Sequence, residues 1–161
     1  MADAQAQGPQ ERLHQRRLET AATGKKRLLS EDRSVELIRE LYEARARNDI
    51  AAIRSILDEN VVWYEPELEA EHTGDLRGSE AVLAMIGEAR RITGGTFSLV
   101  PRQIVANGEH AVALIDWSAT RGGERLEGKE VAVYRVRNGR VVEASFHQDN
   151  PDKDREFWER A

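Results

Sequence analysis

The residues best suited to chemistry gather in the C-terminal third of the sequence, where acids, a histidine and large aromatics alternate with small residues. From Ala111 to Asp149 the pattern predicts three antiparallel strands joined at Gly122-Gly123 and Asn138-Gly139. Such dipeptides favour two-residue hairpin loops, because these turns need positive φ angles. Counting back from the two turns then gives the register of the strands. One face of the sheet collects aromatic and ionisable side chains, namely Ile115, Trp117, Glu130, Ala132, Tyr134, Ser145, His147 and Asp149.

The register predicted across the second turn sets Glu130 directly opposite His147, with Ile115 on the other side of Glu130. A carboxylate beside an imidazole holds it in one tautomer and raises its basicity. His147 is therefore a candidate general base or acid oriented by Glu130, and Asp149 or Glu65 would supply the second proton-transfer group. A structural ion pair at the rim of a cavity is the alternative interpretation, and both stay open on the residue types alone.

Aromatic side chains accompany these acids. Carboxyl groups against tryptophan in a dry cavity are expected to have raised pKa values, which makes them competent acids or bases near neutral pH. The expected ligand-contacting residues are large and mostly apolar, with one histidine from a loop: Trp63, Trp117, Tyr134, Ile115 and His72. The tryptophans could equally be core residues, and His72 could serve only to cap its loop.

Metal and cofactor chemistry find little support. The residues His72, His147, Glu65 and Asp149 are suitable ligand types, but no compact metal-binding motif is present and the chain has no cysteine. We therefore expect no metal and no cofactor.

The opposite face of the same strands is predicted to be apolar. If the helices cover the ionisable face, this apolar surface stays open in a monomer, and patches of this kind mark interaction sites. The prediction is a homodimer through the convex face of the sheet. Asp116 falls on this face opposite Lys129 and is expected to form a structural pair. The apolar residues are Val112, Leu114, Val131, Val133, Val142, Ala144 and Phe146.

The preceding sequence supplies helices. An acidic start at Ser30 leads into an apolar stripe of Val35, Ile38, Leu41 and Tyr42, and Asp49 is placed to cap a second, short helix. A strand over 61–65, a helix from 79 and a strand over 96–106 with a bulge near Pro101 follow. Helix, helix, strand, helix and four antiparallel strands make an α+β domain with the helices on one side.

Residues 1–30 show no sustained apolar face and are predicted to be a disordered tail or a frayed helix, followed by one domain over 31–161. The basic cluster in this tail could contact an acidic partner. The 161 residues carry a formal net charge of −5, which argues against nucleic acid as the main partner. No apolar segment has the length of a signal core or a membrane span, so no membrane partner and a cytoplasmic location are expected.

Four segments resemble the nuclear transport factor 2-like superfamily, most closely its SnoaL-like members, which share the ketosteroid isomerase-like fold. They are Asp49–Trp63, His72–Val82, Asn138–Glu143 and the tail from Asp149 through Trp158. The resemblance begins near Val35 and implies a cone, in which a strongly curved sheet wraps around a cavity closed by three helices. Relatives often pair through the sheet, which agrees with the predicted homodimer.

The resemblance also bears on the site. Asp149 corresponds to a cavity aspartate of the superfamily's epoxide hydrolases, and Trp63 with Glu65 corresponds to an aromatic and an amide there. Where those hydrolases carry an arginine and a second aspartate, this chain has Ile115, Asp116 and Trp117. The water-activating set is therefore not reproduced, and neither is the oxyanion hole of the steroid isomerases.

Together these observations predict a small-molecule enzyme that uses general acid–base chemistry on an apolar, oxygenated substrate, as an isomerase, cyclase, dehydratase or hydrolase. A non-catalytic ligand-binding or scaffold protein of the same fold is the main alternative. A partner-binding module that uses the basic tail is the third.

Overall fold

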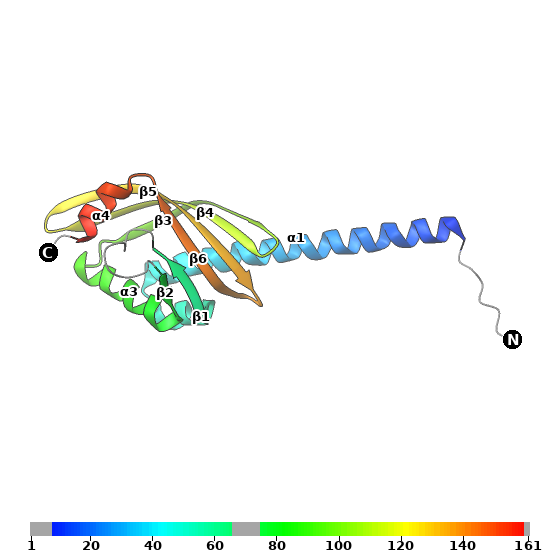
Figure 1. Cartoon of the computed structure of the whole chain (residues 1–161), viewed down its shortest axis with the longest axis horizontal. Coiled ribbons are helices and arrows are strands. Elements are labelled where there is room, and N and C mark those ends of the chain that lie inside the picture. Colours follow the sequence, from blue (N-terminus) through cyan, green and yellow to red (C-terminus); the bar gives the residue numbers. More distant parts are fainter. Residues whose placement is uncertain (1–7, 66–74, 160–161) are drawn as a thin grey trace.

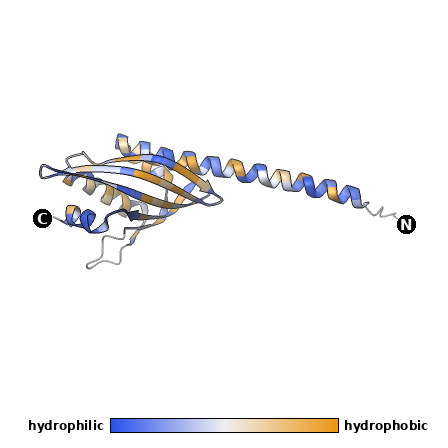
Figure 2. Cartoon of the chain, turned by 90° about the horizontal axis from the view of Figure 1, so that it is seen from above, coloured by the Kyte–Doolittle hydropathy of each residue, from blue (hydrophilic) through white to orange (hydrophobic). Residues whose placement is uncertain are grey.

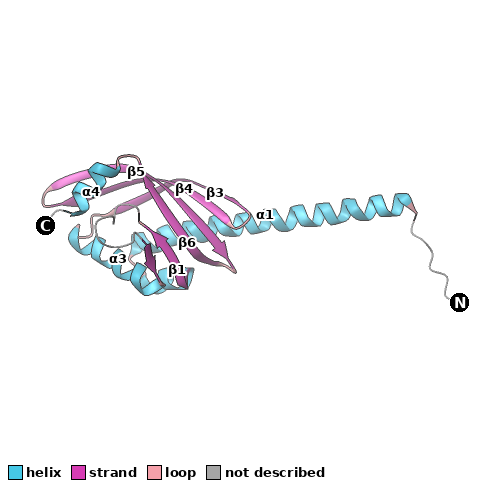
Figure 3. Cartoon of the chain, viewed as in Figure 1, coloured by secondary structure: helices cyan, strands magenta, loops and turns pink. Residues whose placement is uncertain are grey.

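The computed structural model describes residues 8–65 and 75–159, and a curved sheet backed by helices dominates it (Figure 1). The helices are α1 (Pro9–Arg47), α2 (Ile50–Ile56), α3 (Ser79–Ile92) and α4 (Pro151–Glu159). The strands are β1 (Leu57–Tyr64), β2 (Asp75–Arg77), β3 (Ser98–Asn107), β4 (His110–Arg121), β5 (Glu124–Arg137) and β6 (Arg140–Gln148). This arrangement confirms the predicted α+β class, a conical sheet closed by helices (Figure 3).

The six strands form one sheet in the order β2-β1-β6-β5-β4-β3. Neighbouring strands are antiparallel except β1 and β6, which run parallel. The predicted interruption near Pro101 is confirmed as a shift in the β3–β4 register between Pro101 and Gln103. The predicted cap of the second helix is also present, because Asp49 accepts a hydrogen bond from the backbone N–H of Ala52 at 3.0 Å.

The first hairpin has the predicted register. Arg121 lies opposite Glu124, Trp117 opposite Gly128, and Ile115 opposite Glu130. The two-residue loop at Gly122-Gly123, with φ angles of 57° and 83°, therefore fixes the pairing of β4 with β5 over their whole shared length.

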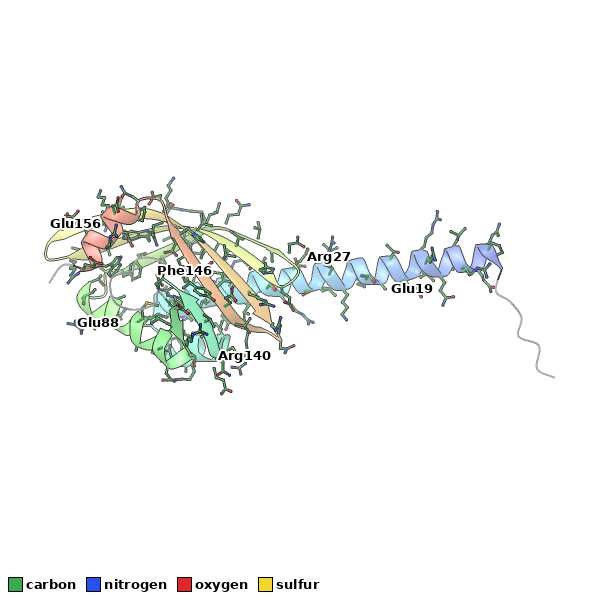
Figure 4. The ribbon with its side chains drawn as sticks, in the orientation of Figure 1. Glu19, Arg27, Glu88, Arg140, Phe146 and Glu156 are labelled. Atoms are coloured by element: carbon green, nitrogen blue, oxygen red, sulfur yellow. The ribbon has the colours of Figure 1, made fainter. Side chains whose placement is uncertain are left out.

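The register predicted for the second hairpin is wrong beyond its first rungs. Val136 pairs with Val141 but Arg135 pairs with Glu143, so Val142 is an extra residue in a bulge of β6. One added residue moves every following side chain to the other face. Glu130 therefore lies opposite Gln148, and His147 lies opposite Val131. Phe146 and Ala144, expected on the convex face, are buried in the interior, as Figure 4 shows for Phe146.

We call the side of the sheet that bears Ile115, Trp117, Glu130 and Tyr134 the inner face, and the side that bears Leu114 and Asp116 the outer face. The inner face and the helices enclose the core. Trp63 is fully buried there, and its ring lies 4.7 Å from that of Phe146, centroid to centroid. Burial of each large apolar side chain of this kind contributes roughly 1.5–3 kcal/mol. From the helices the core receives Ile38, Leu41, Tyr42, Ile53, Val82 and Ile86.

A second cluster closes the opposite end of the interior. Phe157 and Trp158 of α4 lie against Trp117, with ring centroids 6.5 Å apart in both cases. Phe97 completes the group, and its ring lies 5.1 Å from Trp158. The guanidinium of Arg121 donates hydrogen bonds to the carbonyls of Phe157 and Trp158. The C-terminal segment therefore docks where the sheet would otherwise open.

The helix α1 is longer than predicted. It begins at Pro9, with Ser30 inside it, and projects well beyond the sheet (Figure 1). Its first buried residue is Ser34, and Leu13, Leu18, Leu28 and Leu29 before it are more than half exposed. Apolar and polar residues are mixed along this projecting part (Figure 2). The predicted domain boundary near residue 30 stays a prediction, although the side chains that pack on the sheet begin close to it.

No helix within 8–65 and 75–159 is both long enough and apolar enough to cross a membrane.

Candidate active site

Glu65 and Trp63 form the first element of the site. Glu65 directly follows β1, and one of its carboxylate oxygens accepts a hydrogen bond from the indole Nε1 of Trp63 at 2.7 Å. Burial raises the pKa of Glu65 to about 7; the Trp63 hydrogen bond offsets part of this rise, and the negative charge of Glu130 adds to it. Glu65 is therefore present in both protonation states near neutral pH, as a catalytic acid or base requires.

Glu130 is the second acid of the site, and a relay of hydrogen bonds that crosses three strands holds it. The indole Nε1 of Trp117 on β4 donates to Gln148 Oε1 at 2.9 Å, and Gln148 Nε2 on β6 donates to Glu130 Oε2 on β5 at 2.5 Å. Burial raises the pKa of Glu130, while the positive charge of Arg45 and the Gln148 hydrogen bond lower it in part. The side chain of Glu130 is 8% exposed.

Gly128 makes room for this relay. It lies opposite Trp117 in the β4–β5 register, and a Cβ atom at this position would lie 2.7 Å from the indole ring. Only glycine lets the indole lie across the strand and reach Gln148. Gly128 is thus a positioning residue for Glu130.

A pair of tyrosines joins α1 to the sheet. The hydroxyls of Tyr42 and Tyr134 are 2.5 Å apart, and both residues are buried. Burial raises the pKa of both phenols, so both keep their protons across the physiological range. One hydroxyl must donate to the other, which leaves one O–H free to donate to a bound oxygen.

Two further charges act on the carboxyls. Arg45 lies in the last turns of α1, three residues after Tyr42, and its positive charge lowers the pKa of Glu65 and Glu130. Asp154 of α4 is 4% exposed, and its negative charge raises both values. The Trp158 indole Nε1 donates to Asp154 at 3.1 Å. The interior thus holds three acids and one partly buried guanidinium.

A pocket of about 260 Å³ reaches Tyr42 from the surface. It lies between α1, α3 and the start of β3, and its lining includes Tyr42, Arg45, Ile86, Arg90, Phe97 and Leu99. Glu65 and Glu130 do not line it directly. Tyr42 and Arg45 belong both to the pocket wall and to the electrostatic surroundings of the two acids.

A second hollow of about 430 Å³ lies on the outer side of β3, β4 and β5. Its charged residues neutralise one another: Arg102 is 2.7 Å from Asp116, and Arg125 is 2.7 Å from Glu127. Asp116 does lie opposite Lys129 as predicted, but its ion pair is with Arg102. Because these four charges are paired and exposed, we do not assign chemistry to this groove.

The structure brings together six of the residues singled out from the sequence and separates the others. Inside or bordering the interior are Trp63, Glu65, Ile115, Trp117, Glu130 and Tyr134. The predicted Glu130–His147 pair is wrong, because the β6 bulge turns His147 outward, where it is exposed. Asp149 is also exposed and bonds the backbone N–H of Lys129 at 3.1 Å. His72 lies outside the described residues.

The sequence-based site missed four residues: Tyr42, Arg45, Gln148 and Asp154. Tyr42 belonged to the apolar stripe of the first helix, and Arg45 follows it at helical spacing, so that stripe could have revealed both. Gln148 and Asp154 had no such signal, because their positions depend on the bulge in β6 and on the docking of α4. Among the described residues, no three histidine, cysteine or acidic side chains are grouped to hold a metal ion.

Comparison with known proteins agrees with this architecture. An uncharacterized protein of Mycobacterium tuberculosis is 25% identical over 131 residues, 81% of this chain and 99% of its own length. The structure of Bal32a, from a soil-derived mobile gene cassette, has a TM-score of 0.75 and 29% identity, covering 80% of this chain and 98% of its own. An LEH-like epoxide hydrolase of M. tuberculosis shares the fold at a TM-score of 0.60 and 18% identity, covering 74% of this chain and 84% of its own. Residues 38–144 match the model of the SnoaL-like domain, and the chain belongs to that family.

Proposed function

We propose that this protein is a small-molecule enzyme that performs general acid–base chemistry in the interior of the cone. The observation that carries the proposal is the carboxyl of Glu65, which is held by Trp63 and has a pKa near 7. Membership of the SnoaL-like family, and the similarity of the fold to that of an epoxide hydrolase, support chemistry on small molecules. The substrate class we propose is an oxygenated, largely apolar molecule, and the reaction an isomerisation, cyclisation, dehydration or hydrolysis.

The residues divide the work of a proton transfer. Ionised Glu65 accepts a proton from the substrate, and the electron pair of the broken bond moves toward a substrate oxygen. Tyr42, hydrogen-bonded to Tyr134 and facing the pocket, donates a hydrogen bond to that oxygen, while the positive charge of Arg45 stabilises the developing negative charge. Return of the proton from Glu65 to another atom completes an isomerisation.

Glu130 has a supporting role in this scheme. Its charge acts on both Glu65 and Tyr42, and the Trp117–Gln148 relay fixes its position. Of the acids first considered from the sequence, we retain Glu65 and Glu130. We do not assign His147 or Asp149 a role in the reaction, because both are exposed on the outer side of the sheet.

The test is proton exchange at carbon. Wild-type protein, Glu65→Gln and Tyr42→Phe are incubated in D₂O with a panel of cyclic and polyketide-like ketones, and deuterium incorporation is followed by NMR. We expect exchange by wild type, a loss of about 10²–10⁴-fold in Glu65→Gln, and an intermediate loss in Tyr42→Phe. Glu127→Gln, an exposed acid of the outer groove, is the control and should exchange as wild type does. Equal exchange rates in wild type and Glu65→Gln would contradict the proposal.

A second candidate function is ligand binding without catalysis. The observation that favours it is the aromatic cluster of Phe97, Trp117, Phe157 and Trp158, which fills one end of the interior with side chains. This function predicts that Glu65→Gln alters ligand affinity or melting temperature while no ketone in the panel exchanges.

We also propose that the protein forms a homodimer through the outer face of the sheet. Leu114 and Val131 lie directly opposite each other there and are 43% and 38% exposed. Val100 and Val105 of β3 extend the apolar surface, at 42% and 49% exposed. A second copy would cover this surface. Leu114→Lys should convert a dimer into a monomer in light scattering, whereas Leu13→Lys on the projecting helix should not; a wild-type monomer would contradict the proposal.

A further inference from the structure

The arginines of the domain show a consistent pattern with two exceptions. Between residues 39 and 155 of the described chain, nearly every arginine forms an ion pair with an acid or donates to a backbone carbonyl. Within the same residues, Arg45 and Arg90 alone have no such partner, and both line the pocket that leads to Tyr42. Two cations that form no ion pair with an acid of the described chain therefore line one pocket.

The two guanidiniums come from different elements. Arg45 is half-buried on the last turns of α1. Arg90 is on the last turn of α3, where its guanidinium lies over Gly95, and a Cβ at that glycine would be 3.7 Å from Arg90 Cζ. Gly95 has a φ of 80° and its N–H bonds the carbonyl of Arg90, so the turn that ends α3 also shapes this side of the pocket.

The remaining pocket wall is mixed. Ile86, Phe97 and Leu99 contribute aliphatic and aromatic surface on one part of it, and the Tyr42 hydroxyl, Asn48, Thr96 and Ser98 provide polar groups. The volume of about 260 Å³ lies below the roughly 300–1,000 Å³ of sites for drug-sized ligands. A small pocket with an apolar part to its wall and two cations matches a small amphiphilic anion.

We propose that this pocket binds a small organic carboxylate, with the carboxylate group against Arg45 and Arg90 and the apolar body against Phe97 and Leu99. The proposal rests on the proposed function, because it narrows the substrate of the same site to an oxygenated acid. Arginine suits this role, since its planar guanidinium donates two parallel hydrogen bonds to a carboxylate.

The test compares 1-naphthoate with its uncharged counterpart 1-naphthamide, by calorimetry on the full chain at pH 8 and 150 mM salt. We expect naphthoate to bind at least about tenfold more tightly than naphthamide. Arg45→Gln and Arg90→Gln should each weaken naphthoate binding by about 10- to 100-fold, the loss of a charge-assisted hydrogen bond, and leave naphthamide binding unchanged. The controls are the neighbouring exposed arginines Arg47→Gln and Arg91→Gln, which are paired with Glu43 and Glu88 and should bind both probes as wild type does.

Three outcomes would overturn the proposal: equal affinity of wild type for the two probes, no binding of naphthoate, or weakening by Arg47→Gln as large as by Arg45→Gln. The result is separable from the proposed chemistry, because naphthoate binding requires no turnover. Naphthoate binding that depends on both arginines, without any Glu65-dependent exchange of ketones, would contradict the catalytic proposal alone.

Discussion

The inner and outer faces of the sheet carry acids from the same strands in opposite environments. Glu130 on the inner face is buried, bonded to Gln148 and raised in pKa. Asp116 and Glu127 on the outer face are exposed and paired with Arg102 and Arg125. Alternation along a strand decides which acid enters the interior, and burial without a salt-bridge partner then makes that acid suitable for proton transfer.

The contrast also explains why charge alone is a poor guide to the site. The outer groove has more ionisable groups than the pocket at Tyr42. Its exposed ion pairs nevertheless contribute little to stability, because water and salt screen them. The inner face has few charges, and each acts on the others through a dry interior. We therefore assign the candidate chemistry to the charged groups of the inner face, which are fewer and lie among apolar side chains.

Phe146→Ala should break this contrast most severely. The bulge in β6 places Phe146 on the inner face, where its ring lies 4.7 Å from that of Trp63. Because removing a buried phenylalanine from a core costs about 3–5 kcal/mol, we expect most of the stability to be lost in urea unfolding. His147→Ala, the next residue and exposed on the outer face, is the control. A Phe146→Ala variant as stable as this control would show that the interior does not depend on the side chain that the bulge turns inward.

The pH dependence of stability should sharpen the contrast. The pKa of Glu65 is about 7 in the folded protein, against an ordinary value of 4.5 in the unfolded chain, so the folded state binds the proton more tightly than the unfolded state does. Stability from this group is complete below about pH 4.5 and is lost as pH rises toward 7. At 1.36 kcal/mol for each pKa unit, the loss is on the order of 3 kcal/mol.

Urea unfolding from pH 4.5 to 8 would measure this loss. Glu65→Gln should flatten the profile and be the more stable protein at pH 8, whereas Asp116→Asn on the outer face should retain the slope of wild type. If the stability of wild type falls no more between pH 5 and 7 than the stability of Glu65→Gln does, the pKa of Glu65 is not raised.

We expect Gly128→Ala to have a smaller effect on stability. The added methyl would lie 2.7 Å from the Trp117 indole and should displace it from Gln148, at a cost of about 1–3 kcal/mol in stability. Gly87→Ala is the matched control, because that glycine lies within α3 with open space around it and alanine favours a helix. Equal stability of the two variants would mean that the indole does not need the space above Gly128.

Much of the fold could be predicted from local rules. The Gly122-Gly123 turn fixed the pairing of β4 with β5, and helical spacing placed Ile38, Leu41 and Tyr42 in the core. The β6 bulge could not be predicted, because Val142 resembles its neighbours and the choice of which residue stays unpaired depends on the core that Phe146 enters. That single residue explains why Gln148, and not His147, contacts Glu130.

The site was predictable to a similar extent. Trp63 and Glu65 were found through the resemblance to the superfamily's first strand, which carries an aromatic and an amide two residues apart, and the structure adds the hydrogen bond between them. Arg45 carried a usable signal in its spacing from Tyr42. Asp154 had none, since its approach to the interior depends on how α4 packs against Trp117 and Phe97.

The most direct test of the central claim is the titration of Glu65 itself. NMR of ¹³C-labelled glutamate side chains from pH 3 to 9, with Glu65→Gln to assign the signal, would measure the pKa. We predict a midpoint near 7 for Glu65, well above the exposed glutamates of the outer face. A midpoint near 4.5 would contradict the account, because Glu65 would then be an ordinary ionised carboxylate with no special fitness for proton transfer.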